Sequence, residues 1–290
     1  MLKSYLIAAR PKTLPAAFVP VWVGCILAWH VTGELHWDLA LWTFLGAAAI
    51  QIATNFFNDA IDCERGADTE CRLGPRRVTA SGLLSRRSVY WGAYACLLTA
   101  CLCSLPLLQS RGWIIAVIGI PSLYLSYGYT GGIFPLAYLG LGEVFVILFF
   151  GIVAVGGSYF VQVGTWDWPA GVLGLQVGML SAVLIAINNL RDVEEDKRSN
   201  KNTLAVRFGA VAIHRMLTGL VVVAMMLSFL GSYYGLSWFV ALSVPWFLVG
   251  LLCVRGVKAS PPSRRYNRFL AIAAVQLMLF AILFTAAVLL

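Results

Sequence analysis

The sequence predicts an all-α integral membrane protein that forms one domain over residues 1–290. The chain is 60% hydrophobic and only 12% charged, and its mean hydropathy is +0.82, which lies outside the range of soluble domains. Apolar stretches of the length that a membrane helix needs recur along the whole chain. Lys and Arg gather between alternate pairs of these stretches. Together these three observations exclude a soluble globular protein.

Nine apolar stretches have about the 20 residues that a membrane span requires. The first follows three basic residues, is broken by two prolines and lacks a clear cleavage site, so it reads as a span and not as a signal peptide. The last three are apolar filler around a basic segment, and we expect them to close the bundle. The nine spans are predicted at residues 15–32, 39–57, 89–108, 112–128, 136–160, 170–190, 216–234, 236–254 and 269–290.

The distribution of basic residues predicts the orientation of the chain. With the amino terminus in the cytoplasm, 20 of the 21 Lys and Arg residues fall on the cytoplasmic side, and only Arg111 falls outside. Cytoplasmic loops of membrane proteins carry such an excess. The net charge of +8 is therefore a consequence of topology and does not indicate a nucleic-acid partner.

Two acidic clusters stand where predicted spans end on the cytoplasmic side. The carboxyl end of a helix already carries partial negative charge, so carboxylates there repel it and one another. Span 6 runs into INNLRDVEEDKR, which holds Asp192, Glu194, Glu195 and Asp196. Span 2 runs into a similar segment with Asn55, Asn58, Asp59, Asp62, Glu64 and Asp68.

The two clusters align with each other. A shift of 133 residues superimposes Asn55 on Asn188 and Asp59 on Asp192. Spans 2 and 6 run in the same direction, which predicts a parallel internal repeat of the kind common in membrane folds.

The spacing within each cluster indicates a divalent metal. Asn58 and Asp62, like Asp192 and Asp196, are four residues apart and share one face of a helix. Two such faces in contact would repel by about 4 kcal/mol for each charge pair about 4 Å apart. Mg²⁺ prefers oxygen ligands and is held by carboxylates together with substrate phosphates, and no paired His or Cys indicates zinc. The flanking cations fit a bound phosphate or diphosphate. Alternatively, the charges belong to solvated loops and only set topology.

Several motifs resemble the UbiA superfamily of intramembrane prenyltransferases. NDAID with Asp68, and NNLRDVEEDKR, look like its two aspartate-rich motifs. ARPKTLPAAFVPVWVG (9–24), RLGPRR (72–77), YTGG with PLAYLGLGE (129–143) and KNTLAVRFG (201–209) are most similar to the 1,4-dihydroxy-2-naphthoate prenyltransferase branch. The resemblance covers residues 8–210 and implies nine helices around a central cavity, a bacterial inner-membrane location and a site that faces the cytoplasm.

The resemblance also implies roles for individual residues. The metal ligands for two Mg²⁺ ions would be Asn58, Asp59, Asp62, Asp68, Asp192 and Asp196. The residues that bind substrate would be Lys12, Asn55, Arg72, Tyr129, Asn188, Asn189 and Lys201.

Glu143 is the one acidic residue well inside a span, and ionisable residues there are functional candidates. We expect it, with the aspartates, to be catalytic through acceptor binding or proton handling. A hydrogen bond to a neighbouring helix is the alternative.

The implied reaction is Mg²⁺-dependent transfer of a polyprenyl group from prenyl diphosphate to 1,4-dihydroxy-2-naphthoate with loss of CO₂, which gives a demethylmenaquinone-type lipid. The implied partners are these two substrates and the bilayer, without an obligate protein partner. Aromatic rings near the cytoplasmic level would face the allylic cation, although packing is the more common role of such rings. They are Phe56, Phe57, Tyr124, Tyr127, Tyr129, Phe134 and Tyr138.

The chain departs from the family at two positions. Cys71 stands where members often have Asp, with Glu70 beside it as a substitute, and Ile133 stands where a Pro often follows YTGG. Acceptor choice therefore stays open, with 4-hydroxybenzoate and homogentisate as alternatives. A transporter is the rival of a different class, since broken helices and repeats also create charged sites.

Overall fold

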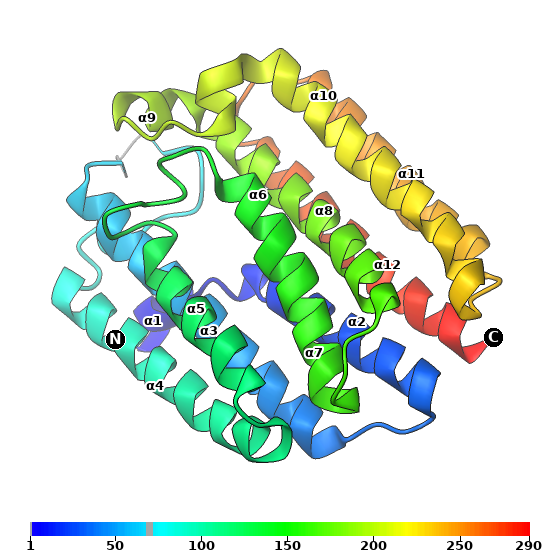
Figure 1. Ribbon diagram of the computed structural model, residues 1–290. Coiled ribbons are helices and arrows are strands. Elements are labelled where there is room, and N and C mark those ends of the chain that lie inside the picture. Colours follow the sequence, from blue (N-terminus) through cyan, green and yellow to red (C-terminus); the bar gives the residue numbers. More distant parts are fainter. Residues whose placement is uncertain (1, 68–71) are drawn as a thin grey trace.

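The computed structural model describes residues 2–67 and 72–290, and within these ranges the chain is helical. The long helices lie side by side, and α9 with the loops that follow α3 and α5 gathers at one end of the bundle (Figure 1). In chain order the elements are α1 (Leu2–Ala9), η1 (Pro11–Thr13), α2 (Pro15–Thr32), α3 (Trp37–Glu64), α4 (Arg86–Arg111), α5 (Ile114–Gly128), α6 (Gly142–Val146), η2 (Ile147–Val153), α7 (Ala154–Val163), α8 (Trp168–Arg191), α9 (Val193–Arg198), α10 (Leu204–Leu227), η3 (Ser228–Tyr234), α11 (Phe239–Lys258) and α12 (Tyr266–Leu289).

Eight helical segments in the described part of the chain are long and apolar enough to cross a membrane. The prediction of an all-α integral membrane protein is therefore confirmed. The span predicted at 112–128 corresponds to α5, which has 15 residues, fewer than the roughly 20 that a crossing needs. The count of nine spans and the cytoplasmic amino terminus thus stay predictions.

Helix α3 continues beyond the span predicted at 39–57 and ends at Glu64. Its 28 residues extend about 42 Å at 1.5 Å per residue, which exceeds the roughly 30 Å thickness of a bilayer's apolar core. Helix α3 is therefore longer than the apolar layer is thick, and its last turns are polar. These turns carry the whole NDAID motif.

Glycines bring the π-helix η2 unusually close to α8. A Cβ atom at Gly151 would collide with the carbonyl oxygen of Gly174, and one at Gly178 would collide with that of Ile147. Small residues allow such backbone contact between membrane helices, and π-helical turns often occur near functional sites. We call this contact the glycine seam. It fixes α6, which leads into η2, against the end of α8.

The core consists of several clusters of buried apolar side chains. The largest packs α2, α7, α8, α11 and α12 around the fully buried rings of Trp246 and Phe280. A smaller core joins α1, α3 and α4 around Phe57 and Val89. The end of α8, from which the second acidic cluster continues, packs in a further core with α10, α11 and α12, and the first acidic cluster leaves the smaller core of α3.

Candidate active site

A single lysine joins the two aspartate motifs at one end of the bundle. Lys201, in the loop between α9 and α10, places its Nζ atom 3.8 Å from Asp62 Oδ2 and 3.7 Å from Asp196 Oδ1. Asp62 lies in the last turns of α3 and Asp196 lies in α9. The two acidic clusters, far apart in sequence, therefore meet across one ammonium group, at the end of the bundle where α9 lies (Figure 1).

Asp62 is held by groups from three other segments. Arg77 Nη2 donates to Asp62 Oδ2 at 3.2 Å, and the Tyr138 hydroxyl donates to Oδ1 at 3.0 Å. The guanidinium of Arg65 stacks over the Tyr138 ring, 4.4 Å from its centroid. Burial, with the negative charge of Asp62, raises the pKa of Tyr138 and keeps its hydroxyl as a proton donor. The sequence indicated Tyr138 only as one of several wall-forming rings, so its bond to Asp62 was missed.

Asp192 is held mainly by the residue that precedes it. Arg191 Nε and Nη2 donate to the two oxygens of Asp192, each at 2.6 Å. This bidentate geometry is the strongest form of a carboxylate–guanidinium pair, and both side chains are almost fully buried. Arg72 approaches the same carboxylate at 3.6 Å from the loop after α3.

Arg191 also ties α12 to the loop that contains Arg72. Its Nη1 donates to Asn267 Oδ1 at 2.7 Å and its Nη2 to Asn188 Oδ1 at 2.8 Å. Asn267 Nδ2 in turn donates to the carbonyl oxygen of Leu73 at 3.0 Å. A Cβ atom at Gly74 would collide with the Arg191 guanidinium, at 2.7 Å. Asn267 was not predicted as a site residue, because it lies among basic residues just before the span predicted at 269–290 and no neighbouring residue in the sequence marks it.

The electrostatics of the site favour an added cation. Burial, together with the nearby charges of Asp192 and Asp62, raises the pKa of Asp196 to about 7 despite the opposing effect of Lys201. Burial lowers the pKa of Lys201, but Asp62 and Asp196 outweigh it and the net pKa is raised. Asp196 thus holds its proton more tightly than usual, chiefly because it is buried and lies near two other aspartates.

The donor set suits a hard divalent cation. Within residues 2–67 and 72–290, no three Asp, Glu, His or Cys side chains lie close enough to form an assembled metal site. The predicted ligand Asp68 lies outside these residues. Asp62, Asp192 and Asp196 offer carboxylate oxygens, the ligands that Mg²⁺ prefers, and two of them already flank a cation.

The remaining polar residues of the first motif contact loops. The side-chain oxygen of Asn58 accepts a hydrogen bond from the Thr130 hydroxyl. Asp59 accepts from the backbone amides of Val78 and Thr79, at 3.1 and 2.9 Å. Both oxygens of Asp59 are therefore engaged in holding the loop after α3, which suits an anchor better than a metal ligand.

The amino-terminal segment is fastened to α3 by Asn55. Its Nδ2 donates to the carbonyl oxygen of Ala9 and to the hydroxyl of Thr13, both at 2.9 Å. Lys12, between these two acceptors in η1, is exposed and forms no ion pair with the described part of the chain. Asn55 thus positions the segment that carries Lys12, and the structure does not bring Lys12 to the carboxylates.

Glu143 and Asn189 face each other across the end of the glycine seam. Asn189 Nδ2 donates to Glu143 Oε1 at 3.0 Å, while Glu143 Oε2 is buried without a partner among the described residues. The hydroxyl of Tyr129 packs against Gly142, where a Cβ atom would lie 2.8 Å from it. Burial and the charges of Glu143, Asp62 and Asp196 raise the pKa of Tyr129, so this phenol lies within electrostatic range of both Glu143 and the aspartates.

An apolar cavity of about 420 Å³ opens beside Tyr129. It lies between α2, α3, α4, α5, η2 and α7, and its walls are mostly aliphatic and aromatic. Gln51, Thr54 and Tyr129 are its polar lining near the aspartate motifs, and Trp42 and Val161 lie toward the opposite end. The charged site and the apolar cavity are thus adjacent, with Tyr129 common to both.

Comparisons with known proteins agree with this arrangement. The model of the UbiA prenyltransferase family matches residues 17–288. The chain is 38% identical over 258 residues to 1,4-dihydroxy-2-naphthoate octaprenyltransferase of Mycobacterium tuberculosis, covering 88% of this chain and 84% of that protein. It is 35% identical over 216 residues to the enzyme of that name in Haemophilus influenzae, covering 72% and 70%. A UbiA homolog from Archaeoglobus fulgidus, solved with DMAPP and Mg²⁺, superimposes with a TM-score of 0.67 at 16% identity over 99% of both chains.

Proposed function

Because the chain belongs to the UbiA prenyltransferase family, we propose that this membrane prenyltransferase transfers a polyprenyl group from prenyl diphosphate to 1,4-dihydroxy-2-naphthoate. The reaction releases diphosphate and CO₂ and gives a demethylmenaquinone-type lipid. The observation that carries this proposal is the contact between the two aspartate motifs at the mouth of an apolar cavity. A charged head and a long apolar tail need these two environments side by side.

The names of the relatives support both substrates. Those from M. tuberculosis and H. influenzae are 1,4-dihydroxy-2-naphthoate octaprenyltransferases, and the Archaeoglobus homolog was solved with DMAPP and Mg²⁺. The 420 Å³ cavity offers the prenyl tail an apolar wall close to Tyr129.

We assign the metal to the two aspartate motifs. Its ligands would come from Asn58, Asp62, Asp192 and Asp196, with Asp68 completing the first motif. Bound Mg²⁺ would neutralise negative charge on the diphosphate as the allylic carbon–oxygen bond breaks. Asp59 is left out of the ligand set and anchors the loop after α3, because backbone amides already occupy its two oxygens.

Basic side chains around the motifs would grip the diphosphate. Lys201 and Arg72 lie within ion-pair distance of the aspartates, so their donors can turn to an anion that enters between them. Preorganised donors aimed at developing charge are usually the largest contribution to catalysis. The exposed Lys12, held in place through Asn55, would meet the anion at the entrance.

Glu143 would act on the aromatic acceptor. Asn189 fixes one carboxylate oxygen, and the unpartnered Oε2 can accept the proton of an acceptor hydroxyl. Loss of that proton makes the ring more nucleophilic toward the allylic cation, which the electron-rich faces of Tyr129 and Tyr138 would stabilise. The new carbon–carbon bond forms at the ring, departure of CO₂ and of the carboxyl proton restores aromaticity, and Glu143 would return the hydroxyl proton to the product.

We place the site on the cytoplasmic side of a bacterial inner membrane. The aspartate motifs lie at the end of the bundle where the basic residues of the sequence gather, which fits the positive-inside bias. Labelling of single cysteines introduced at Arg87 and at Arg111 in inverted and right-side-out vesicles tests this orientation.

The decisive experiment is product formation by purified protein with a long-chain prenyl diphosphate and 1,4-dihydroxy-2-naphthoate, with and without Mg²⁺. We expect Mg²⁺-dependent formation of a prenylated naphthoquinol, with one CO₂ released for each diphosphate. Glu64→Gln, which changes an exposed carboxylate two residues from Asp62, should remain active, and Asp62→Asn should not. Activity on 4-hydroxybenzoate alone would retain the chemistry and overturn the acceptor, and inactivity with every aromatic acceptor would favour transport.

A further inference from the structure

The carboxyl-terminal third of the chain contains many basic residues and no acidic residues to balance them. Residues 197–290 include ten Lys and Arg residues and no Asp or Glu. Of these ten, Lys201 pairs with the aspartate motifs. Arg255 and Lys258, in the last turn of α11, form no ion pair with any described residue. This contrasts with Arg191 and Arg77, which pair with aspartates in the site.

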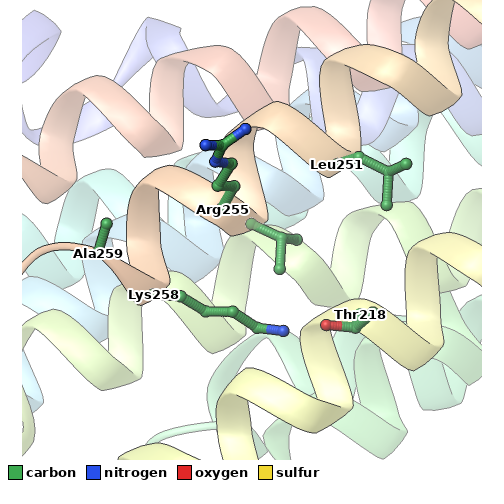
Figure 2. Close-up of a pocket in the computed structure, with 6 residues that line it drawn as sticks. Thr218, Leu251, Arg255, Lys258 and Ala259 are labelled. Atoms are coloured by element: carbon green, nitrogen blue, oxygen red, sulfur yellow. The ribbon is translucent and has the colours of Figure 1, made fainter.

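A groove between α10 and α11 collects two of these cations. It has a volume of about 400 Å³ and is lined by Thr218, Leu251, Val254, Arg255, Lys258 and Ala259. Figure 2 shows the Lys258 side chain extending across the groove toward Thr218, with Leu251 farther along the same wall. The groove is thus cationic at one end and apolar at the other.

The surface beside the groove faces the apolar part of a membrane. Leu248 and Leu252 of α11 are 52% and 67% exposed, and exposed leucines in a spanning helix meet lipid chains. Arg255 and Lys258 lie one and two turns farther toward the end where α12 begins. Asn267, at the start of α12, bonds to Leu73 and Arg191, so the cations lie at the same end of the bundle as the aspartate site.

From this arrangement we infer that the groove between α10 and α11 binds the phosphate headgroup of an anionic phospholipid. Arg255 and Lys258 supply two charges for one phosphate, and the adjacent leucines contact its acyl chains. Basic pockets between spanning helices at the cytoplasmic surface suit such headgroups. The Thr218 hydroxyl donates to the carbonyl oxygen of His214, which leaves its oxygen able to accept from a headgroup hydroxyl.

The helix dipole does not account for the cations by itself. The carboxyl end of α11 carries about half a negative charge, which is less than the two charges of Arg255 and Lys258. The nearby basic residues of the α11–α12 turn and the start of α12, Arg264, Arg265 and Arg268, add to the same excess. An external anion is therefore favoured, and the exposed leucines favour a lipid over free phosphate.

Native mass spectrometry of the purified protein with phosphatidylcholine or phosphatidylglycerol tests the inference. We expect wild type to retain phosphatidylglycerol in preference to phosphatidylcholine. In Arg255→Gln/Lys258→Gln the affinity should fall by about tenfold or more, since each basic residue near the surface contributes appreciably. The matched control is Arg264→Gln/Arg268→Gln, which removes the same charge from exposed positions outside the groove and should lower the affinity clearly less than the groove variant does. Arg255→Lys/Lys258→Arg keeps both charges and should also bind.

Three results would overturn the inference. Wild type that shows no preference for phosphatidylglycerol has no such site. An equal loss in the groove variant and the matched control means that attraction is a diffuse effect of net charge. If inorganic phosphate alone competes with phosphatidylglycerol at equal concentration, the ligand is a soluble anion and not a lipid. Melting in phosphatidylcholine confirms that each variant is folded, and the single changes Arg255→Gln and Lys258→Gln, each with a smaller expected loss of affinity, replace the double variant where it does not fold.

Discussion

The two aspartate motifs are organised in opposite ways. Asp192 receives both of its short hydrogen bonds from Arg191, the preceding residue. Asp62 depends on Arg77, Tyr138 and Lys201, which come from three separate loops. One carboxylate is therefore fixed as soon as α8 forms, whereas the other is fixed only when distant segments have assembled.

Because of this difference, mutations in the two motifs should affect the stability of the protein and the assembly of the site to different degrees. A buried pair within one helix end stabilises that end whether or not the rest of the site is complete. A carboxylate held by three loops is correctly positioned only when all three loops are in place. We therefore expect changes at the first motif to affect activity most, and changes at the second motif to affect folding most.

The largest effect is expected at Asp62. Asp62→Asn removes the charge shared with Lys201 and Arg77, and loss of one such electrostatic contribution lowers the rate by about 10²- to 10³-fold. The asparagine oxygen can still accept from Tyr138, but the neutral amide no longer balances the buried Arg77, so the apparent melting temperature should fall as well. Prenyl transfer at saturating Mg²⁺ measures the rate, and a variant that retains more than a tenth of wild-type activity would contradict the assignment.

The second prediction concerns the stability of the other motif. Arg191→Met leaves Asp192 buried with only the more distant Arg72, and breaking a buried pair costs about 3–5 kcal/mol. The apparent melting temperature should fall markedly. Arg86→Met is the control, because Arg86 and Glu64 are both about half exposed and exposed pairs contribute about 0–1 kcal/mol. Equal melting of the two variants would show that Arg191 does not organise the motif.

A third, smaller effect should follow from Asn267→Ala. This change leaves Arg191 Nη1 and the Leu73 carbonyl oxygen without their partner, and each buried unpaired group costs about 1–3 kcal/mol. The loop with Arg72 should loosen, which would raise the KM for prenyl diphosphate more than it lowers kcat. Arg268→Ala, one residue farther and exposed, serves as the comparison. An unchanged KM together with unchanged melting would remove Asn267 from the site.

The smallest effect is a pH dependence of metal affinity. Burial raises the pKa of Asp196 to about 7, so the metal-free carboxyl is protonated below that pH and must lose its proton to bind a cation. Affinity for Mg²⁺ should thus be nearly constant above pH 8 and fall as pH drops through 7, by at most about tenfold per unit for one proton. Calorimetry without substrate measures it. Equal affinities at pH 6 and pH 8 would contradict the role of Asp196.

Much of the fold could be predicted because membrane helices leave a strong sequence signal. The predicted ends of the spans were wrong where polar residues remain helical. Helix α3 continues to Glu64 through NDAID, since a helix that leaves the bilayer keeps its internal hydrogen bonds. The stretch predicted to begin a span at 136 is instead a series of turns, and α6 begins at Gly142. Hydropathy does not distinguish an apolar turn from the start of a helix.

For the site, the sequence indicated which polar residues gather but not how they pair. Asp59 and Asp62 look equivalent in NDAID, yet one holds a loop through backbone amides and the other meets Lys201. Asp62 lies three residues after Asp59 in the helix, so its side chain points in a different direction. It therefore meets a neighbour from another segment of the chain. Asn267 could not have been found, because its partners lie in segments far away in sequence.

The glycine seam decides which side of the cavity can adapt. Backbone already touches backbone where Gly151 meets α8, so the backbone of η2 cannot move toward α8 to enlarge the cavity. Any adjustment to a bulkier tail must come from the opposite wall, where the short helix α5 follows α4. The residues that determine the length of the prenyl chain are then expected on α4 and α5, at positions such as Cys103 and Ile118. The glycine seam would form the wall that does not move.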